Sequence, residues 1–184
     1  MKKFRLSLCI VTASFIVSAA FAQEKTVMVG GAAMYPSKDI VQNAMNSKDH
    51  TTLVAAVKAA GLVQTLESPG PFTVFAPTNA AFNLLPEGTV DALLKPENKK
   101  MLTGILTYHV VPGRLDTKEL HRLIKAGHGT AELTTVEGDK LWVMMKDGSY
   151  WVKDKKGDVA KITIQDVYQS NGIIQVIDHV MLYN

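Results

Sequence analysis

The chain has 184 residues, of which 47% are hydrophobic and 20% are charged, and it carries a formal net charge of +3. This length and composition predict one globular domain that can bury its own apolar core. A net charge this small gives no reason to expect nucleic acid as a partner.

Residues 1–22 are predicted to be a cleaved signal peptide. Three basic residues lie among the first five, an apolar run follows at 6–17, and Ala20-Phe21-Ala22 has the small residues that precede a cleavage site. The run is short for a permanent membrane helix, so we expect no membrane insertion after signal cleavage. An uncleaved N-terminal anchor is the alternative. We therefore expect a secreted protein, either periplasmic or extracellular.

Removal of the signal peptide would change two bulk properties. The lysines and arginines fall from 20 to 17 (20 − 3), which equals the 17 acidic residues, so the net charge becomes zero. The single cysteine, Cys9, also leaves. A secreted domain without disulfides must be held together by its apolar core alone.

Residues 23–36 are predicted to be a lead segment, followed by a single domain at 37–184. The first half of that domain has apolar residues at helical spacing, with Gly61 and Gly127 as helix ends. A β-rich stretch at 72–75 lies between turn residues and predicts one early strand.

After about residue 130 the pattern changes to short apolar strands. Glu-Gly, Asp-Gly, Lys-Gly and Asn-Gly pairs separate them at intervals of about 10 residues, which is typical of an antiparallel meander. Helices followed by strands predict the α+β class, and the early strand must join the later sheet. The predicted late strands are 133–136, 141–145, 150–152, 159–167 and 173–182.

The residue inventory favours a protein without catalytic activity. The histidines form no recognised metal-ligand spacing with one another or with acids, and the chain has no Gly-x-Ser-x-Gly nucleophile motif. We therefore predict no catalytic residue, no metal and no cofactor. Tyr108 and His109 could exchange protons in principle, but a buried pair that braces the junction between a helix and a strand is the favoured interpretation.

Two further groups of residues are interpreted structurally. The lysine run at 153–156 is predicted to be a solvated hairpin tip. Trp142, Tyr150 and Trp151 are predicted to pack inside the sheet as cross-strand aromatics. The alternative is an outward tryptophan that stacks on a sugar or anchors a protein contact.

Three segments in order resemble the fasciclin domain, an extracellular module: 70–82, Tyr108-His109-Val110-Val111 and 170–182. The resemblance implies a β-wedge of two roughly orthogonal sheets with helices packed along one side. It also implies a set of residues with structural roles. These signature residues are Thr73, Phe75, Pro77, Thr78, Asn79, Asn171, Gly172 and Asp178.

The resemblance further implies a secreted adhesion or extracellular-matrix module that acts through protein–protein contacts. The alternative is a periplasmic or cell-surface protein that binds polysaccharide or a small ligand. The expected partner is a cell-surface or matrix protein or glycan, and we expect a monomer. Candidate interaction residues are Tyr108, His109, Asp166 and Val167, although Asp166 is more simply interpreted as a strand-end residue before the Asn171-Gly172 turn.

Overall fold

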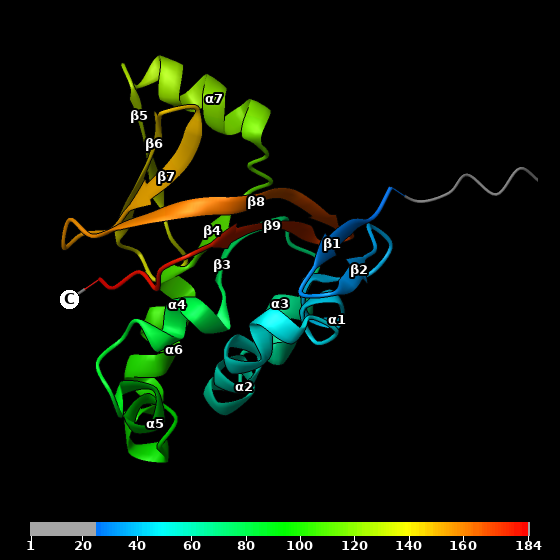
Figure 1. The fold of residues 1–184 in the computed structure, drawn as a ribbon, viewed down its shortest axis with the longest axis vertical. Coiled ribbons are helices and arrows are strands. Elements are labelled where there is room, and N and C mark those ends of the chain that lie inside the picture. The colour runs from blue at the N-terminus through cyan, green and yellow to red at the C-terminus, as the bar shows by residue number, and fades with distance from the viewer. Residues whose placement is uncertain (1–24, 184) are drawn as a thin grey trace, which may run out of the picture.

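The structure is a computed structural model that describes residues 25–183, so the predicted signal peptide at 1–22 lies outside the described residues. A continuous seven-stranded sheet runs through the molecule, and a separate hairpin precedes it (Figure 1). The hairpin pairs β1 (Val27–Val29) with β2 (Ala32–Met34). The order in the sheet is β4 (Val110–Pro112), β3 (Phe72–Pro77), β9 (Gly172–Ile177), β8 (Val159–Gln169), β7 (Ser149–Lys153), β6 (Lys140–Lys146) and β5 (Thr130–Thr134).

The predicted meander is confirmed, because β5 to β9 pair with their sequence neighbours in antiparallel fashion. The early strand also joins this sheet as predicted. Strand β3 lies parallel to β9 and antiparallel to β4. Its pairing with β9 brings the first and last parts of the domain together.

Strand β8 connects two parts of the sheet that run in different directions. Strands β5–β7 rise across the direction of β8 and β9 in Figure 1. The register of β8 against β9 shifts twice, between Ile162 and Ile164 and between Ile164 and Val167. Such irregularities bend a strand and increase its twist, which lets one strand belong to both parts of the sheet.

Six α-helices lie on one side of β8 and β9, and α7 (Thr117–Ala126) lies alone on the other side (Figure 1). The α+β class is therefore confirmed, with α7 as an exception to the expected placement of helices along one side. Leu120 and Ile124 of α7 are buried in the cluster that covers β5 and β6. The other helices are α1 (Ile40–Ala44), α2 (Thr51–Ala60), α3 (Val63–Glu67), α4 (Asn79–Asn83), α5 (Thr89–Leu93) and α6 (Lys99–Tyr108), with 3₁₀ turns η1 (Lys48–His50) and η2 (Pro96–Asn98).

Strands β3 and β9 separate two apolar clusters. Successive side chains of a strand point to opposite faces, so Ile174 and Val176 join the cluster under α1–α6, while Ile173 and Ile177 join the cluster under α7. Every residue of β9 is buried. This is the pattern of a strand covered on both faces.

Two predicted boundaries differ from the structure. The last strand ends at Ile177 rather than at residue 182, because the amides of Met181 and Leu182 bond to side chains instead of to a neighbouring strand. The lead segment at 23–36 contains the β1–β2 hairpin, and its residues Val29 and Met34 are buried in the first apolar cluster.

Asn171 ties this hairpin end of the sheet to the helices. Its Oδ1 accepts a hydrogen bond from the Ile40 amide at 3.0 Å, and its Nδ2 donates to the carbonyls of Leu66 and Ser68 at 2.7 and 3.0 Å. These contacts bridge more than 100 residues of sequence. One buried amide therefore holds the start of α1, the end of α3 and the turn before β9.

Replacing Asn171 with alanine is expected to destabilise the fold by about 3 kcal/mol, because it leaves buried backbone groups without partners. Urea unfolding of the purified protein measures the loss. Asn83→Ala is the matched control, because Asn83 is exposed at the end of α4 and should change stability by less than about 0.5 kcal/mol. Equal effects from the two substitutions would contradict this role of Asn171.

Candidate functional site

The candidate site is built around Tyr108 and His109, where α6 ends and β4 begins. Both side chains are buried, with 0% and 3% of their surface exposed. His109 Nδ1 lies 2.8 Å from the Ile105 carbonyl oxygen, and its Nε2 lies 3.0 Å from the Met181 amide nitrogen. Since an amide can only donate and a carbonyl can only accept, the ring is neutral with its proton on Nδ1.

The surroundings of His109 favour this neutral form. Burial lowers the pKa of His109 to about 4, and the hydrogen bond with the Ile105 carbonyl opposes that shift only in part. A group that is neutral throughout the physiological range is well suited to a fixed structural contact.

Tyr108 makes the complementary contact on the other side of the junction. Its hydroxyl donates to the Lys140 carbonyl at 2.8 Å and accepts from the Lys155 amide at 3.0 Å. Burial is the main cause that raises the pKa of Tyr108 to about 12. The ring centroid lies 5.7 Å from that of Tyr183. Tyr108 thus connects the end of the β5–β6 hairpin to the end of the β7–β8 hairpin. His109 connects the C-terminal segment to α6.

The tyrosine–histidine pair therefore has the contacts of a brace. Every polar atom of the two side chains is engaged with a backbone group, and all of these groups except the Ile105 carbonyl, one helical turn away, are distant in the sequence. A free proton donor or acceptor facing a cleft is not part of this arrangement. Contact of this pair with a partner stays a prediction.

Other signature residues also bond to backbone groups. Thr73 Oγ1 donates to the Gly113 carbonyl at 2.7 Å and accepts from the Leu115 amide at 2.8 Å. Asn79 bonds to the Thr52 amide, the Lys48 carbonyl and Thr51 Oγ1. The remaining members act as follows: Thr78 caps α4 through the Ala81 amide, Asp178 accepts from the Lys161 amide, and Phe75 and Pro77 are buried.

Gly172 is needed because β3 passes very close to β9. A Cβ atom at this position would collide with the Phe72 carbonyl oxygen and would crowd the Ile40 side chain. The backbone itself is part of a regular pairing, since Gly172 is the register partner of both Phe72 and Gln169. The residue thus allows two strands and a helix to meet.

Asp166 lies inside β8 rather than at its end, and it holds α7 in place. Its carboxylate accepts from the amide and the hydroxyl of Thr117 and from Gln175 Nε2 at 2.9 Å. Its backbone has a positive φ of 55°, which is uncommon for a residue with a side chain. Its neighbour Val167 is buried, with 1% of its surface exposed. The carboxylate is engaged within the fold, and a role of this pair in partner binding stays a prediction.

The core interpretation of the aromatic hairpin is correct for Tyr150 and wrong for the two tryptophans. Tyr150 is buried, and its hydroxyl bonds to the Thr117 carbonyl. Trp142 and Trp151 lie on the opposite face of β6 and β7, where both are half-buried. The physical reason is alternation along the strand: α7 covers the face that carries Tyr150, so the tryptophans face outward.

Sequence reasoning missed several buried polar side chains, among them Asp154 and Gln175. Asp154 is 1% exposed although it interrupts a lysine run, and its carboxylate accepts from the amides of Asp158 and Leu182. The prediction of a solvated tip is wrong for this residue. Gln175 is fully buried and joins the Leu115 carbonyl to Asp166. An acid within a basic turn, four residues before another acid, is the signal that could have identified Asp154.

Two chemical features are absent from residues 25–183. No group of three or more histidine, cysteine, aspartate or glutamate side chains within this range is placed to hold a metal ion. No helix within the same range is long and apolar enough to cross a bilayer.

Fold and site together define an α+β domain of the fasciclin type. A solved FAS1 domain pair from the insect cell adhesion molecule Fasciclin I has the same fold, with a TM-score of 0.71 over 80% of this chain and 52% of that chain. Sequence identity in this match is 19%. The family model for the fasciclin domain matches residues 48–183. The chain belongs to the fasciclin domain family.

Relatives of the chain occur in bacteria and animals. Protein sll1483 of Synechocystis sp. is 46% identical over 159 residues, which cover 86% of this chain and 81% of that protein. Transforming growth factor-beta-induced protein ig-h3 of Sus scrofa is 32% identical over 179 residues, covering 97% of this chain and 24% of that protein. The family comprises adhesion- and matrix-associated proteins and is generally non-enzymatic.

Replacing Tyr108 with phenylalanine is expected to cost about 1–3 kcal/mol of folding free energy, because the Lys140 carbonyl and the Lys155 amide lose their common partner. Thermal or urea unfolding measures the change. Tyr35→Phe removes a hydroxyl from a more exposed tyrosine and should be nearly neutral. A neutral Tyr108→Phe variant would show that the hydroxyl does not brace the hairpins.

Stability is expected to fall by about 2 kcal/mol between pH 7 and pH 5 through His109 alone. The folded-state pKa is about 4, below the ordinary value of about 6.5 in the unfolded chain. The unfolded state therefore binds more protons in this window, and the free energy of unfolding decreases as the pH falls towards 4. Urea unfolding at both pH values measures the difference.

The variant His109→Ala separates this contribution from that of other groups. At pH 7 it should cost about 1–3 kcal/mol, because the Met181 amide and the Ile105 carbonyl lose their partner. Its stability should depend less on pH than that of the wild type, with a remainder from His50, whose pKa is also lowered by burial. An unchanged pH dependence would argue against a neutral, buried His109.

Proposed function

We propose that the protein is a secreted adhesion or matrix-interaction module that acts through protein–protein contacts and performs no catalysis. The observation that carries the proposal is the internal use of Tyr108 and His109, whose polar atoms bind backbone groups of the same domain. The signature maintains a scaffold, and the outer surface is left to meet a partner. The match to a cell adhesion molecule supports the same proposal.

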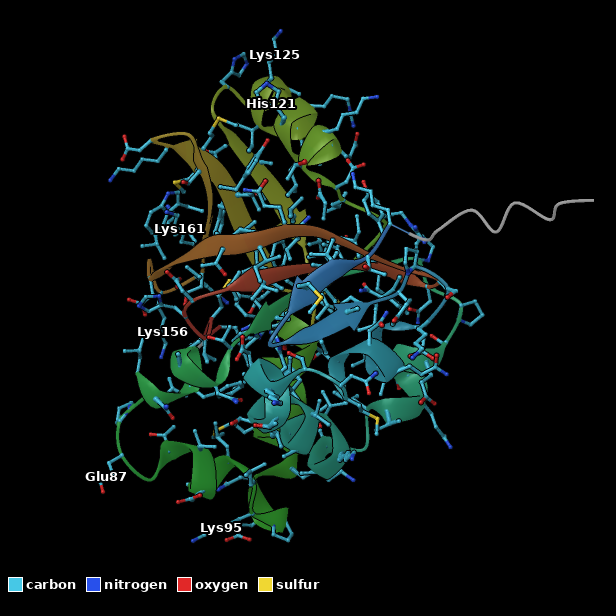
Figure 2. All side chains as sticks on the ribbon, turned by 45° about the vertical axis from the view of Figure 1, so that its right-hand side comes forward. Glu87, Lys95, His121, Lys125, Lys156 and Lys161 are labelled. Atoms are coloured by element: carbon cyan, nitrogen blue, oxygen red, sulfur yellow. The ribbon has the colours of Figure 1, made fainter. Side chains whose placement is uncertain are left out.

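The outer face of β6–β8 is the surface best suited to this contact. We call it the tryptophan face and define it by Trp142, Trp151, Lys153 and Lys161. Lys153 Nζ lies 5.6 Å from the Trp142 ring centroid, and Lys161 Nζ lies 5.9 Å from that of Trp151. Figure 2 shows Lys161 at the molecular surface, well separated from His121 and Lys125 on α7. Half-buried tryptophans are rigid anchors that frequently dominate protein interfaces.

A second candidate function, binding of a polysaccharide, is favoured by the same face. Indole rings stack on sugar rings, and nearby lysines suit sugars that carry carboxylate or sulfate groups.

Replacing Trp142 and Trp151 with alanine is expected to weaken binding to envelope or matrix fractions by about 30-fold, the effect typical of an interface hot spot. The measurement is a titration of labelled, purified protein against each fraction. Leu84→Ala is the matched control, because Leu84 is an exposed apolar residue at the end of α4, 63% exposed, and it should bind like the wild type.

Treatment of the fractions distinguishes the two candidate functions. Loss of binding after protease digestion supports a protein partner, and loss after periodate oxidation of glycans supports a polysaccharide. If the double tryptophan variant binds each fraction as well as the wild type does, the tryptophan face is not the contact surface.

A further inference from the structure

An apolar cavity of about 70 Å³ lies between α1, α2, α3 and α6 and the adjoining face of β3, β8 and β9. Twenty-five residues line it, and all except His50, Lys58, Thr65, Thr107 and His109 are apolar. Native cores contain few voids larger than a water molecule. A space of this size, set within one of the two apolar clusters, is therefore a specific feature of this domain.

The cavity lining includes exposed residues as well as buried ones. Its lining extends from Lys58 and Thr65, which are exposed on α2 and α3, to Val136 in the turn between β5 and β6. Thr107 and Val136 also line an open concavity on the outside of α6. A lining made almost entirely of apolar side chains suits an apolar group such as an alkyl chain.

The two histidines in the lining do not add charge to the cavity. Burial lowers the pKa of both His50 and His109, so both rings are neutral at physiological pH. His50 is 3% exposed, and its Nε2 makes no hydrogen bond of normal geometry. Its Nδ1, on the other side of the ring from Nε2, lies 2.9 Å from Ser47 Oγ.

Lys58 supplies the only formal charge in the lining. It lies in the last turn of α2 and is exposed. Within residues 25–183, no ion pair involves its ammonium group. A carboxylate at this end of the cavity would find a cation, while the attached chain would find apolar side chains.

We propose that this cavity binds the alkyl chain of a fatty acid, with the carboxylate placed at Lys58. Burial of methylene groups supplies the binding free energy, at about 0.8 kcal/mol for each one removed from water. Lys58 selects an acidic end over a neutral one. This site is separate from the tryptophan face, so its occupancy and the proposed adhesion are tested independently.

The test titrates delipidated protein with decanoate and with decanol in a calorimeter. The expected result is saturable binding of decanoate with one site per chain. Binding should also raise the unfolding temperature, because the ligand binds the folded state. Absence of saturable binding by the wild type would overturn the proposal.

Two substitutions test the two parts of the site. Val54→Phe places a ring into the cavity lining and should weaken the binding of both ligands at least about tenfold. Ala55→Phe, at an exposed position of the same helix, should leave the binding of both ligands unchanged. Lys58→Gln should weaken decanoate by about tenfold and leave decanol unchanged, with Lys118→Gln on α7 as the charge-matched control.

Each remaining outcome contradicts one part of the proposal. Wild-type affinity in a folded Val54→Phe variant would place the ligand outside the cavity. If Lys58→Gln changes the affinities for decanoate and decanol equally, the carboxylate does not bind at Lys58. If Val54→Phe does not fold, Ala44→Leu narrows the same cavity from α1, with the same expected loss of both ligands.

Discussion

The fold depends on one buried imidazole. His109 accepts the amide hydrogen of Met181, 72 residues further along the chain, and donates to the carbonyl of the preceding helical turn. A segment that has left the sheet has no strand partner for its backbone, and a buried amide without a partner is costly. His109 and Asp154 meet this need by bonding successive amides of the C-terminal segment. The domain can therefore close over α6 without a further strand.

The same principle explains why many residues of the family signature are polar side chains in apolar surroundings. Thr73, Asn79, Tyr108 and Asn171 each join backbone groups from segments that are distant in the sequence. Apolar contacts are tolerant of small displacements, whereas hydrogen bonds fix distance and direction. Apolar burial thus provides most of the stability, and these side chains select one arrangement of the segments.

Much of this architecture could be predicted from local sequence. Period and turn residues identified the α+β class, the meander and the early strand, and the setting of Tyr108-His109 indicated a brace. The partners of the brace could not be predicted, because sequence gives no distance between residues 109 and 181. The predicted burial of the tryptophans was wrong for a related reason. Alternation places Trp142 and Tyr150 on opposite faces, but only the position of α7 decides which face is covered. The positive φ of Asp166 was hidden because nothing in a β-rich run indicates a change of register.

The two apolar clusters on opposite sides of β3 and β9 have a consequence for the dynamics of the domain. Neither cluster can be exposed to water without removing the cover from strands that the other cluster also needs. Amide hydrogens of β3 and β9 should accordingly exchange with solvent only when the whole domain unfolds. The central parallel pair then acts as the last cooperative unit to be lost.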